Sequence, residues 1–389
     1  MAEKNDKESR EDDTTGDMMP VFPLRSRVPM KSLELEKRPY GIANDKVNNC
    51  MAETDAIKII RENPEEDLKT SCYAWPPINK RKKKNSHAYV NVQLLIPFVV
   101  DIRRPLKEAD FCIMDAVSNI CYYAQRQSPG KPVYVTIPEI WRYMAGKMGD
   151  FKAKPSEKSY KAIRDRLDYM RMTTVKIDLK DELEKNEITI KDGRLIDGEI
   201  EDYVIDATKA KFTTDRGQEL TGYIIRSMPV LYSYSRQFTT DNENHNHILY
   251  VNYSLFDIAG HAKLDLDTFA VMRYMIRQIE LIKNGILDSH RILLDTLYEK
   301  CFLKTPEQRA EINGRTDFSG SGCPSQSADA TYIRKQKARD VKKVEGILNA
   351  WTDKGWISGY SLTKKGKSVR GFDIDISERD IIDVNFQTE

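Results

Sequence analysis

Residues 330–376 read ATYIRKQKARDVKKVEGILNAWTDKGWISGYSLTKKGKSVRGFDIDI, which predicts one long helix and then two strands joined by a tight turn. Four apolar residues recur at the 3-4-3 spacing of a single helix face, namely Val341, Val344, Leu348 and Trp351. Four basic residues lie on the opposite face, namely Lys335, Arg339, Lys342 and Lys343. Asp329 can cap the start of this helix, and Gly355 closes it. The pattern predicts a helix with a core face and a basic face.

The two strands after this helix enclose a lysine-rich turn. In the second strand Phe372, Ile374 and Ile376 alternate with aspartates, so one face of that strand is expected to be buried. The turn itself carries Lys364, Lys365 and Lys367. Three functions fit such a turn: a nucleotide-binding loop ending in GKS, a basic finger against phosphates, or a soluble hairpin tip.

A nucleotide-binding loop requires G-x-x-x-x-G-K-[ST] between a strand and a helix. The position of its first glycine holds Ser361, and a strand rather than a helix follows Ser368. Both the sequence and the context therefore exclude this reading. Because the turn follows a basic-faced helix, we interpret it as the wing of a DNA-binding domain, with solubility as the plain alternative.

Charge is unevenly distributed along the chain, although the net charge of its 389 residues is only +2. Residues 331–370 hold eleven basic residues against three acidic ones, a net of +8. Residues 152–180 hold nine against four, a net of +5, and residues 181–220 hold six against twelve, a net of −6. Two separate basic blocks in a nearly neutral chain are typical of two surfaces that contact a polyanion.

The first basic block has the same design as the second. A helix is predicted over "PEIWRYMAG", with Thr136 as its cap, Pro138 in its first turn and Gly146 at its end. A basic loop containing Lys154 leads to Ser156, which can cap the next helix. The strand, helix, turn, helix and strand order is typical of a winged helix-turn-helix, whose second helix enters the major groove.

The helix after Ser156 also has two faces. Tyr160, Ile163, Leu167 and Met170 make its apolar stripe. Rotation by about 100° per residue places Lys158, Lys161, Asp165 and Tyr169 on the other side, with Arg166 beside them. We expect Lys158, Lys161 and Arg166 to contact DNA, and we expect the acidic residues 181–220 to form an insertion that faces away from it.

The predicted fold is therefore α+β, with two tandem winged helix-turn-helix domains and a disordered N-terminal tail. Residues 1–85 form the tail, whose first stretch is too polar to fold and which carries the basic run Lys80 to Lys84. Residues 86–260 form the first domain and residues 261–389 the second. No apolar run is long enough for a membrane span, and six cysteines without a CxxC pair indicate reduced thiols, so a cytoplasmic protein is expected.

Two successive winged helices resemble the plasmid and phage replication initiator (Rep) proteins. The resemblance rests on "IPEIWRYMAGK" and "PSEKSYKAIRDRLDYMRMT" in the first half and "IRKQKARDVKKVEGILNAWTDKGWISGY" in the second, and it covers residues 86–380 as a pattern of elements. It implies that the two domains read two halves of a repeated origin sequence, that dimers repress and monomers open the origin, and that host helicase is a partner.

The same resemblance places recognition-helix positions at Lys158, Lys161 and Arg166 in the first domain and at Lys335, Arg339 and Lys342 in the second. Lys364, Lys365 and Lys367 match the wing. Arginines on such faces can make forked contacts to guanine edges, whereas wing lysines neutralise phosphates. The long tail and the acidic insertion depart from the family pattern and leave the mode of dimerisation open.

Enzymatic functions have weaker signals. His245 and His247 stand one residue apart before a strand, as in rolling-circle nucleases that hold a metal and use a tyrosine nucleophile. Their central residue is apolar, whereas here it is Asn246, so we treat this nuclease as a secondary alternative. No catalytic residue, metal site or cofactor is expected, and Trp141, Trp351 and Trp356 are expected to pack in the core.

Two non-enzymatic alternatives stay open. Tandem winged helices bind operators as readily as origins, so a transcriptional repressor is the first alternative. The second alternative is a partner-loading protein whose winged helices bind a helicase rather than DNA. Such a protein would not need the net charge of +8 that residues 331–370 carry. The sequence therefore predicts a sequence-specific binder of double-stranded DNA that initiates replication of a plasmid or phage-like element.

Overall fold

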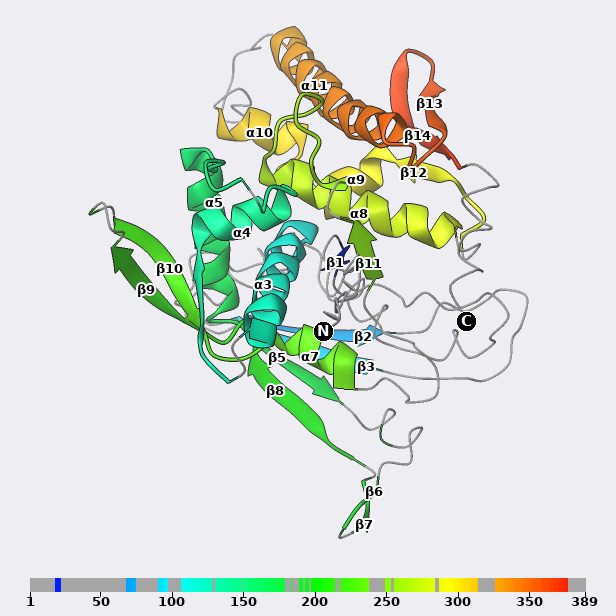
Figure 1. The fold of residues 1–389 in the computed structure, drawn as a ribbon. Coiled ribbons are helices and arrows are strands. Elements are labelled where there is room, and N and C mark those ends of the chain that lie inside the picture. The colour runs from blue at the N-terminus through cyan, green and yellow to red at the C-terminus, as the bar shows by residue number, and fades with distance from the viewer. Residues whose placement is uncertain are drawn as a thin grey trace, which may run out of the picture.

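Helices and small antiparallel sheets alternate along the chain and share one hydrophobic core in the computed structural model (Figure 1). The structure describes strands at residues 18–21, 68–74 and 90–96. From residue 106 to residue 376 it describes the chain apart from 128–129, 149, 179–182, 184–188, 192, 196, 214–216, 218, 238–248, 253–254, 284–286 and 314–325. The predicted mixture of helix and sheet is confirmed.

The first half runs helix, strand, helix, helix and, after further strands, a hairpin. These elements are α3 (Glu108–Gln127), β4 (Val133–Thr136), α4 (Ile137–Met144), α5 (Glu157–Met170), β9 (Ala207–Thr213) and β10 (Glu219–Ile225). β10 lies between β4 and β9, with Tyr223 opposite Val135 on one side and Lys209 on the other. The first strand of the unit therefore pairs with the last strand.

The starts of α4 and α5 follow from the capping residues that the sequence indicated, whereas the long helix predicted to begin at Asp329 already begins at Gln326. The Thr136 side chain accepts a hydrogen bond from the Glu139 backbone N–H while the Glu139 carboxylate accepts one from Thr136, so α4 begins with a capping box. Ser156 accepts from the backbone N–H of Ser159 at the start of α5. Gly146, just after α4, has a φ of 65°, a conformation that favours glycine.

The second half repeats this order of elements. It contains α8 (Leu266–Lys283), β12 (Arg291–Leu293), α9 (Leu294–Lys300), α10 (Pro306–Ile312), α11 (Gln326–Asp353), β13 (Gly359–Lys365) and β14 (Ser368–Asp375). β14 lies between β12 and β13, so the strand order matches that of the first half. α10 was not predicted from the sequence, although Thr305 and Gln308 form a second capping box.

The C-terminal hairpin has the expected form. β13 and β14 pair antiparallel, and Gly366 at the turn has a φ of 61°. Phe372 and Ile374 are buried, as the alternation predicted, while Asp373 bonds to Arg291 and Thr363 at the surface.

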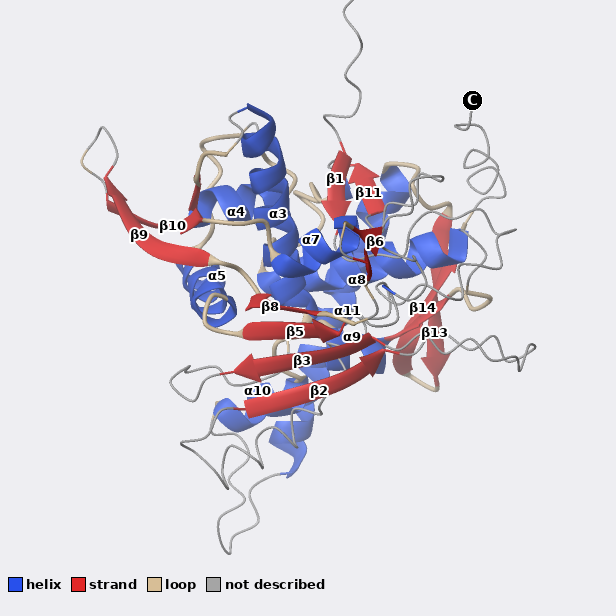
Figure 2. Ribbon diagram, turned by 90° about the horizontal axis from the view of Figure 1, so that it is seen from below, coloured by secondary structure: helices blue, strands red, loops and turns tan. Residues whose placement is uncertain are grey.

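A further sheet involves the N-terminal part of the chain (Figure 2). Its order is β2 (Leu68–Ala74), β3 (Val90–Ile96), β5 (Thr174–Asp178) and β8 (Glu199–Tyr203). β1 (Met18–Val21) pairs with β11 (Leu249–Asn252), β6 (Thr189–Ile190) pairs with β7 (Gly193–Arg194), and α7 (Val230–Gln237) follows β10.

Two strands lie within residues 1–85, which were predicted to be a largely disordered tail. Residues 18–21 pair with β11 from late in the chain, and residues 68–74 pair with the nearby β3. The rest of the tail, including Lys80 to Lys84, lies outside the described residues. The acidic stretch 181–220 does hold inserted strands, yet it also contains β9, one strand of the first-half hairpin.

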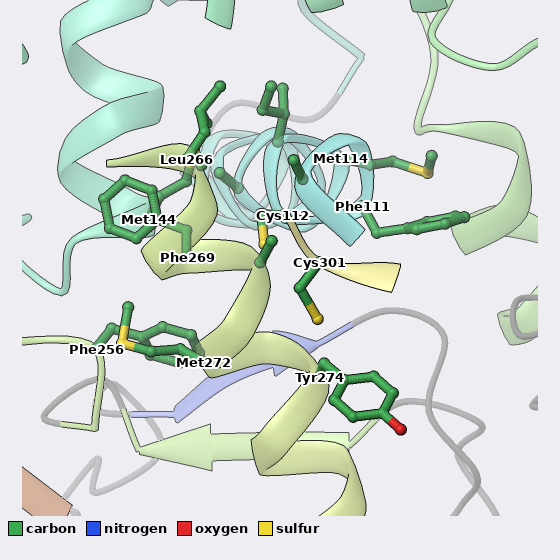
Figure 3. Packing of buried hydrophobic residues seen from close by; sticks show 14 of the residues in the cluster. Phe111, Cys112, Met114, Met144, Phe256, Leu266, Phe269, Met272, Tyr274 and Cys301 are labelled. Carbon is green, nitrogen blue, oxygen red and sulfur yellow. The ribbon is translucent and has the colours of Figure 1, made fainter. Parts of the chain in front are cut away.

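The core is centred where α3 packs on α8. Phe111 and Cys112 of α3 and Phe269 and Met272 of α8 belong to this core, and Figure 3 shows Cys112 between Phe269 and Cys301. Ile163, Leu167 and Met170 of α5 are buried, as are Val344, Leu348 and Trp351 of α11, so both predicted apolar stripes face the core. Cys112, Cys121 and Cys301 are buried free thiols.

The helices in the described part of the chain were also compared with what a bilayer span requires. None of them is both long enough and apolar enough to cross a membrane.

Candidate nucleic-acid interface

One face of α11 is basic and exposed. Lys335, Arg339 and Lys342 are exposed and follow one another at spacings of four and three residues. Because such spacings return to one side of a helix, the three side chains lie along one ridge. None of them forms an ion pair with another residue in the part of the chain that the structure describes. Their charges are therefore available to an outside partner.

The lysine turn is a second exposed basic feature. Lys364, Lys365 and Lys367 are exposed around Gly366, at the tip of the β13–β14 hairpin. The hairpin is fixed to the helix, since the Tyr360 hydroxyl on β13 donates to Asn349 Oδ1 on α11 at 2.9 Å. We call Lys335, Arg339, Lys342, Lys364, Lys365 and Lys367 together the C-terminal basic surface.

A buried carboxylate positions the basic ridge of α11. Asp340, next to Arg339, is 3% exposed and accepts a hydrogen bond from Arg309 Nη1 of α10 at 3.0 Å. Burial raises the pKa of Asp340, although the hydrogen bond from Arg309 acts in the opposite direction. This pair fixes the rotation of α11 about its axis, which keeps Arg339 directed outward.

Lys343 corrects a prediction, because it does not belong to the exposed basic face. Its Nζ lies 2.8 Å from Asp265 Oδ1, just before α8, and only 16% of its side chain is exposed. Burial acts to raise the pKa of Asp265, but the charge and hydrogen bond of Lys343, with a bond from Thr268, lower it overall. Lys343 joins α11 to α8 instead of facing an external partner.

The first half offers a smaller set of exposed cations. Lys154 precedes α5, and Lys158 and Lys161 lie on its first turns, all exposed. The structure thus places these three residues at the surface, as expected. We call them the α5 basic surface.

Arg166 and Tyr169 are the main corrections to the predicted first-half site. Arg166 is 7% exposed and donates from Nη1 to Asp110 Oδ1 of α3, while Tyr169 is 1% exposed. The physical reason is helical geometry: a residue three positions after Ile163 lies about 60° from it, within the side of α5 that α3 covers. Arg166 is a core ion-pair residue and cannot reach a base edge from this position.

Lys209 on β9 is a cationic position that was not predicted from the sequence. Lys209 Nζ lies 2.6 Å from Asp168 Oδ2 of α5, and Arg171 Nε lies 2.9 Å from the other oxygen of the same carboxylate. Burial acts to raise the pKa of Asp168, but these hydrogen bonds lower it overall. The alternation of lysines in "ATKAKFT" was the signal, and it was hidden by the acidic composition of residues 181–220.

The described residues give no support to the enzymatic alternatives. His245 and His247, the proposed nuclease pair, lie outside the described residues. Among the described side chains, no group of three or more His, Cys, Asp or Glu residues is placed to hold a metal ion. Trp141 and Trp351 are buried and Trp356 packs against the core, as predicted.

Comparisons with known proteins were made for the whole chain. No protein-family model matches the sequence. No curated protein matches it either. Among solved structures, the chain is similar to the crystal structure of SeMet derivatives of domains 2 and 3 of RctB, at 12% identity and a TM-score of 0.33, over 80% of this chain and 91% of that one. A TM-score of this size does not define the fold or function of this chain.

Proposed function

We propose that this chain binds double-stranded DNA sequence-specifically through two winged helix-turn-helix units and initiates replication of a plasmid or phage-like element. The proposal is supported by the repeated order of helix, strand, two or more helices and hairpin, with the first strand paired to the last in both halves. In winged helices, the helix before the hairpin enters the major groove and the hairpin turn lies beside the backbone.

The observation that carries the proposal is the C-terminal basic surface. Arg339 and Lys342 on α11 and Lys365 on the adjoining turn are exposed, and α11 is packed on the same hairpin that carries the turn. A helix ridge and a loop that both present cations can contact a groove and the phosphates beside it at once. If these charges served only solubility, they would not need to lie on two elements that a hydrogen bond joins.

The residue types suggest a division of roles. A lysine ammonium neutralises phosphates and releases counterions, which gives affinity without sequence information. The planar guanidinium of Arg339 can donate two hydrogen bonds to the O6 and N7 atoms of guanine. Arg339 is therefore the proposed base-reading residue, and Lys364, Lys365 and Lys367 are the proposed phosphate contacts.

The contact between α3 and α8 favours the initiator over other DNA-binding proteins. Arg273 of α8 is bonded to Glu108 and Asp115 of α3, and all three side chains are buried. Two non-identical reading units held in this way would contact two DNA segments at one fixed spacing and orientation. Such an arrangement suits direct repeats of an origin, where host helicase would then be recruited.

The test is footprinting on fragments of the source replicon, combined with a salt titration. We expect protection of direct repeats, and an affinity that falls steeply as salt rises because several phosphate contacts are lost. Protection of one inverted repeat at a promoter would instead identify a transcriptional repressor. The absence of selective binding at low salt would refute DNA recognition by these surfaces.

A further inference from the structure

Phe151, in the loop between α4 and α5, is the most exposed of the large hydrophobic side chains in the described part of the chain. Its exposed fraction is 79%, against 61% for Tyr134 and 61% for Ile312. Folding gains almost nothing from an aromatic ring in that position. The ring therefore requires an explanation other than packing within this chain.

The loop that carries Phe151 is anchored on both sides of it. Asp150 Oδ1 accepts hydrogen bonds from the backbone N–H groups of Lys152 at 3.0 Å and Ala153 at 3.2 Å. Met148 and Ala153 pack against the hydrophobic core. Phe151 thus stands exposed on a turn that Met148 and Ala153 hold against the core.

The loop is also tied to the second half of the molecule. The Lys147 ammonium lies 3.6 Å from Asp257 Oδ1, in the segment that precedes α8. The Arg142 guanidinium of α4 lies 5.6 Å from the centre of the Phe151 ring. A cation at this distance restricts the ring while leaving most of it open to solvent.

The surroundings of the ring are cationic. Lys152 and Lys154 are exposed on the same turn, and the exposed Lys158 follows on the first turn of α5. An aromatic ring between lysines is suited to a ligand that combines flat apolar faces with negative charge. Nucleobases on a phosphate backbone have this combination.

We propose that Phe151 stacks on a nucleobase at a distorted step of the bound duplex, while Lys152 and Lys154 bind the flanking phosphates. This inference rests on the proposed DNA binding and deepens it by assigning an aromatic wedge to the first half. Apolar wedges of this kind partly unstack a base step and kink the duplex. A fixed turn favours this role, since the ring is already ordered before it meets DNA.

The experiment uses the full chain and a series of duplexes of its protected site, each with 2-aminopurine at one position. The fluorescence of 2-aminopurine rises when its stacking is disturbed. We expect the wild type to increase fluorescence at one step, and Phe151→Ala to abolish that increase and weaken binding about tenfold, as expected for one lost stacking contact. The salt dependence of binding should stay unchanged, because no phosphate contact is removed.

Two variants serve as controls. Phe151→Leu should keep part of the fluorescence increase, because leucine can still insert as an apolar wedge. Tyr134→Ala removes an exposed aromatic ring on β4, outside this lysine-rich turn, and should behave as the wild type. The same 2-aminopurine series in single strands shows whether the stacked base comes from a duplex or from unpaired DNA. A Phe151-dependent fluorescence increase confined to single strands would contradict stacking at a step of the duplex.

The outcomes separate this inference from the proposed function. If the wild type binds the duplex but Phe151→Ala gives the same fluorescence at every position, the stacking role is overturned and DNA binding stands. If the wild type does not increase the 2-aminopurine fluorescence at any position of the duplex, the stacking role is likewise overturned. If the wild type binds no DNA selectively, the proposed function itself is refuted.

Discussion

Arg273 on α8 donates from Nη1 to Glu108 Oε2 on α3 at 2.6 Å, and the two side chains are 1% and 0% exposed. Its Nε donates to Asp115 Oδ2, also at 2.6 Å. Arg277 adds a third contact, with Nη2 at 3.3 Å from Glu108 Oε1. These ion pairs join the first helices of the two repeated units in the middle of the core.

Arg273→Met should strongly destabilise the protein, because it leaves the carboxylates of Glu108 and Asp115 buried beside fewer cations. Removing one partner of a buried ion pair costs about 3–5 kcal/mol. The free energy of unfolding from urea titration, followed by circular dichroism, measures the loss.

The matched control is Arg291→Met. Arg291 Nη2 lies 3.1 Å from Asp373 Oδ2, but its side chain is 51% exposed. Such a surface pair contributes about 0–1 kcal/mol. Equal losses of unfolding free energy in the two variants would show that the buried ion pairs of Arg273 contribute no more to stability than a surface pair.

Lys342 and Lys343 are neighbours with opposite expected roles. Lys342→Ala should weaken binding to all DNA sequences and lower the slope of log affinity against log salt by about 1, as for one lost phosphate contact. Lys343→Met should leave that slope unchanged and lower the free energy of unfolding by about 1–2 kcal/mol, because it breaks the bond to Asp265. Salt-dependent gel shifts and urea titration measure the two effects. A reversed pattern would contradict the assignment of Lys343 to the core.

The ion pair between Lys343 and Asp265 should make stability depend on pH in the acidic range. The folded-state pKa of Asp265 is lowered below the usual value of about 3.9, so its contribution is complete above that value and is lost as pH falls through the folded-state pKa. The difference in unfolding free energy between wild type and Lys343→Met should therefore stay constant from pH 7 down to about pH 4 and shrink as the pH falls further. A difference that does not shrink below about pH 4 would rule out the pair as its source.

Arg339 and Lys365 should differ in specificity. Arg339→Ala should lower the affinity for the cognate site while leaving non-cognate binding much less affected, because about 1–3 kcal/mol of base discrimination is lost. Lys365→Ala should weaken cognate and non-cognate binding alike. Competition gel shifts with both DNAs measure the ratio. Equal effects of the two variants on every DNA would refute the division of roles.

Several local features of this protein could be read directly from its residues. Thr136 and Ser156 begin helices, Gly366 forms the hairpin turn, and the apolar stripes of α5 and α11 face inward. These features depend on interactions between residues a few positions apart, so hydrogen-bonding groups and apolar spacing are sufficient to predict them.

The candidate site was predicted in part for the same reason. Exposed positions opposite a strong apolar stripe, such as Lys335 and Lys342, follow from helical periodicity. Residues at the margin of a stripe do not, because whether they are covered depends on which element packs there. Arg166 meets Asp110 and Lys343 meets Asp265 for this reason, and neither partner is near in the sequence.

By itself, the sequence determined most of the helices, the caps of α4 and α5, the basic ridge of α11 and the lysine turn, since each is encoded within a few turns of chain. The tertiary structure alone decided that α3 and α8 share buried ion pairs, that β3 pairs with both β2 and β5, and that Phe151 stands exposed on an anchored turn. The physical reason is that burial and charge pairing depend on contacts between segments far apart in the sequence, which local periodicity does not encode.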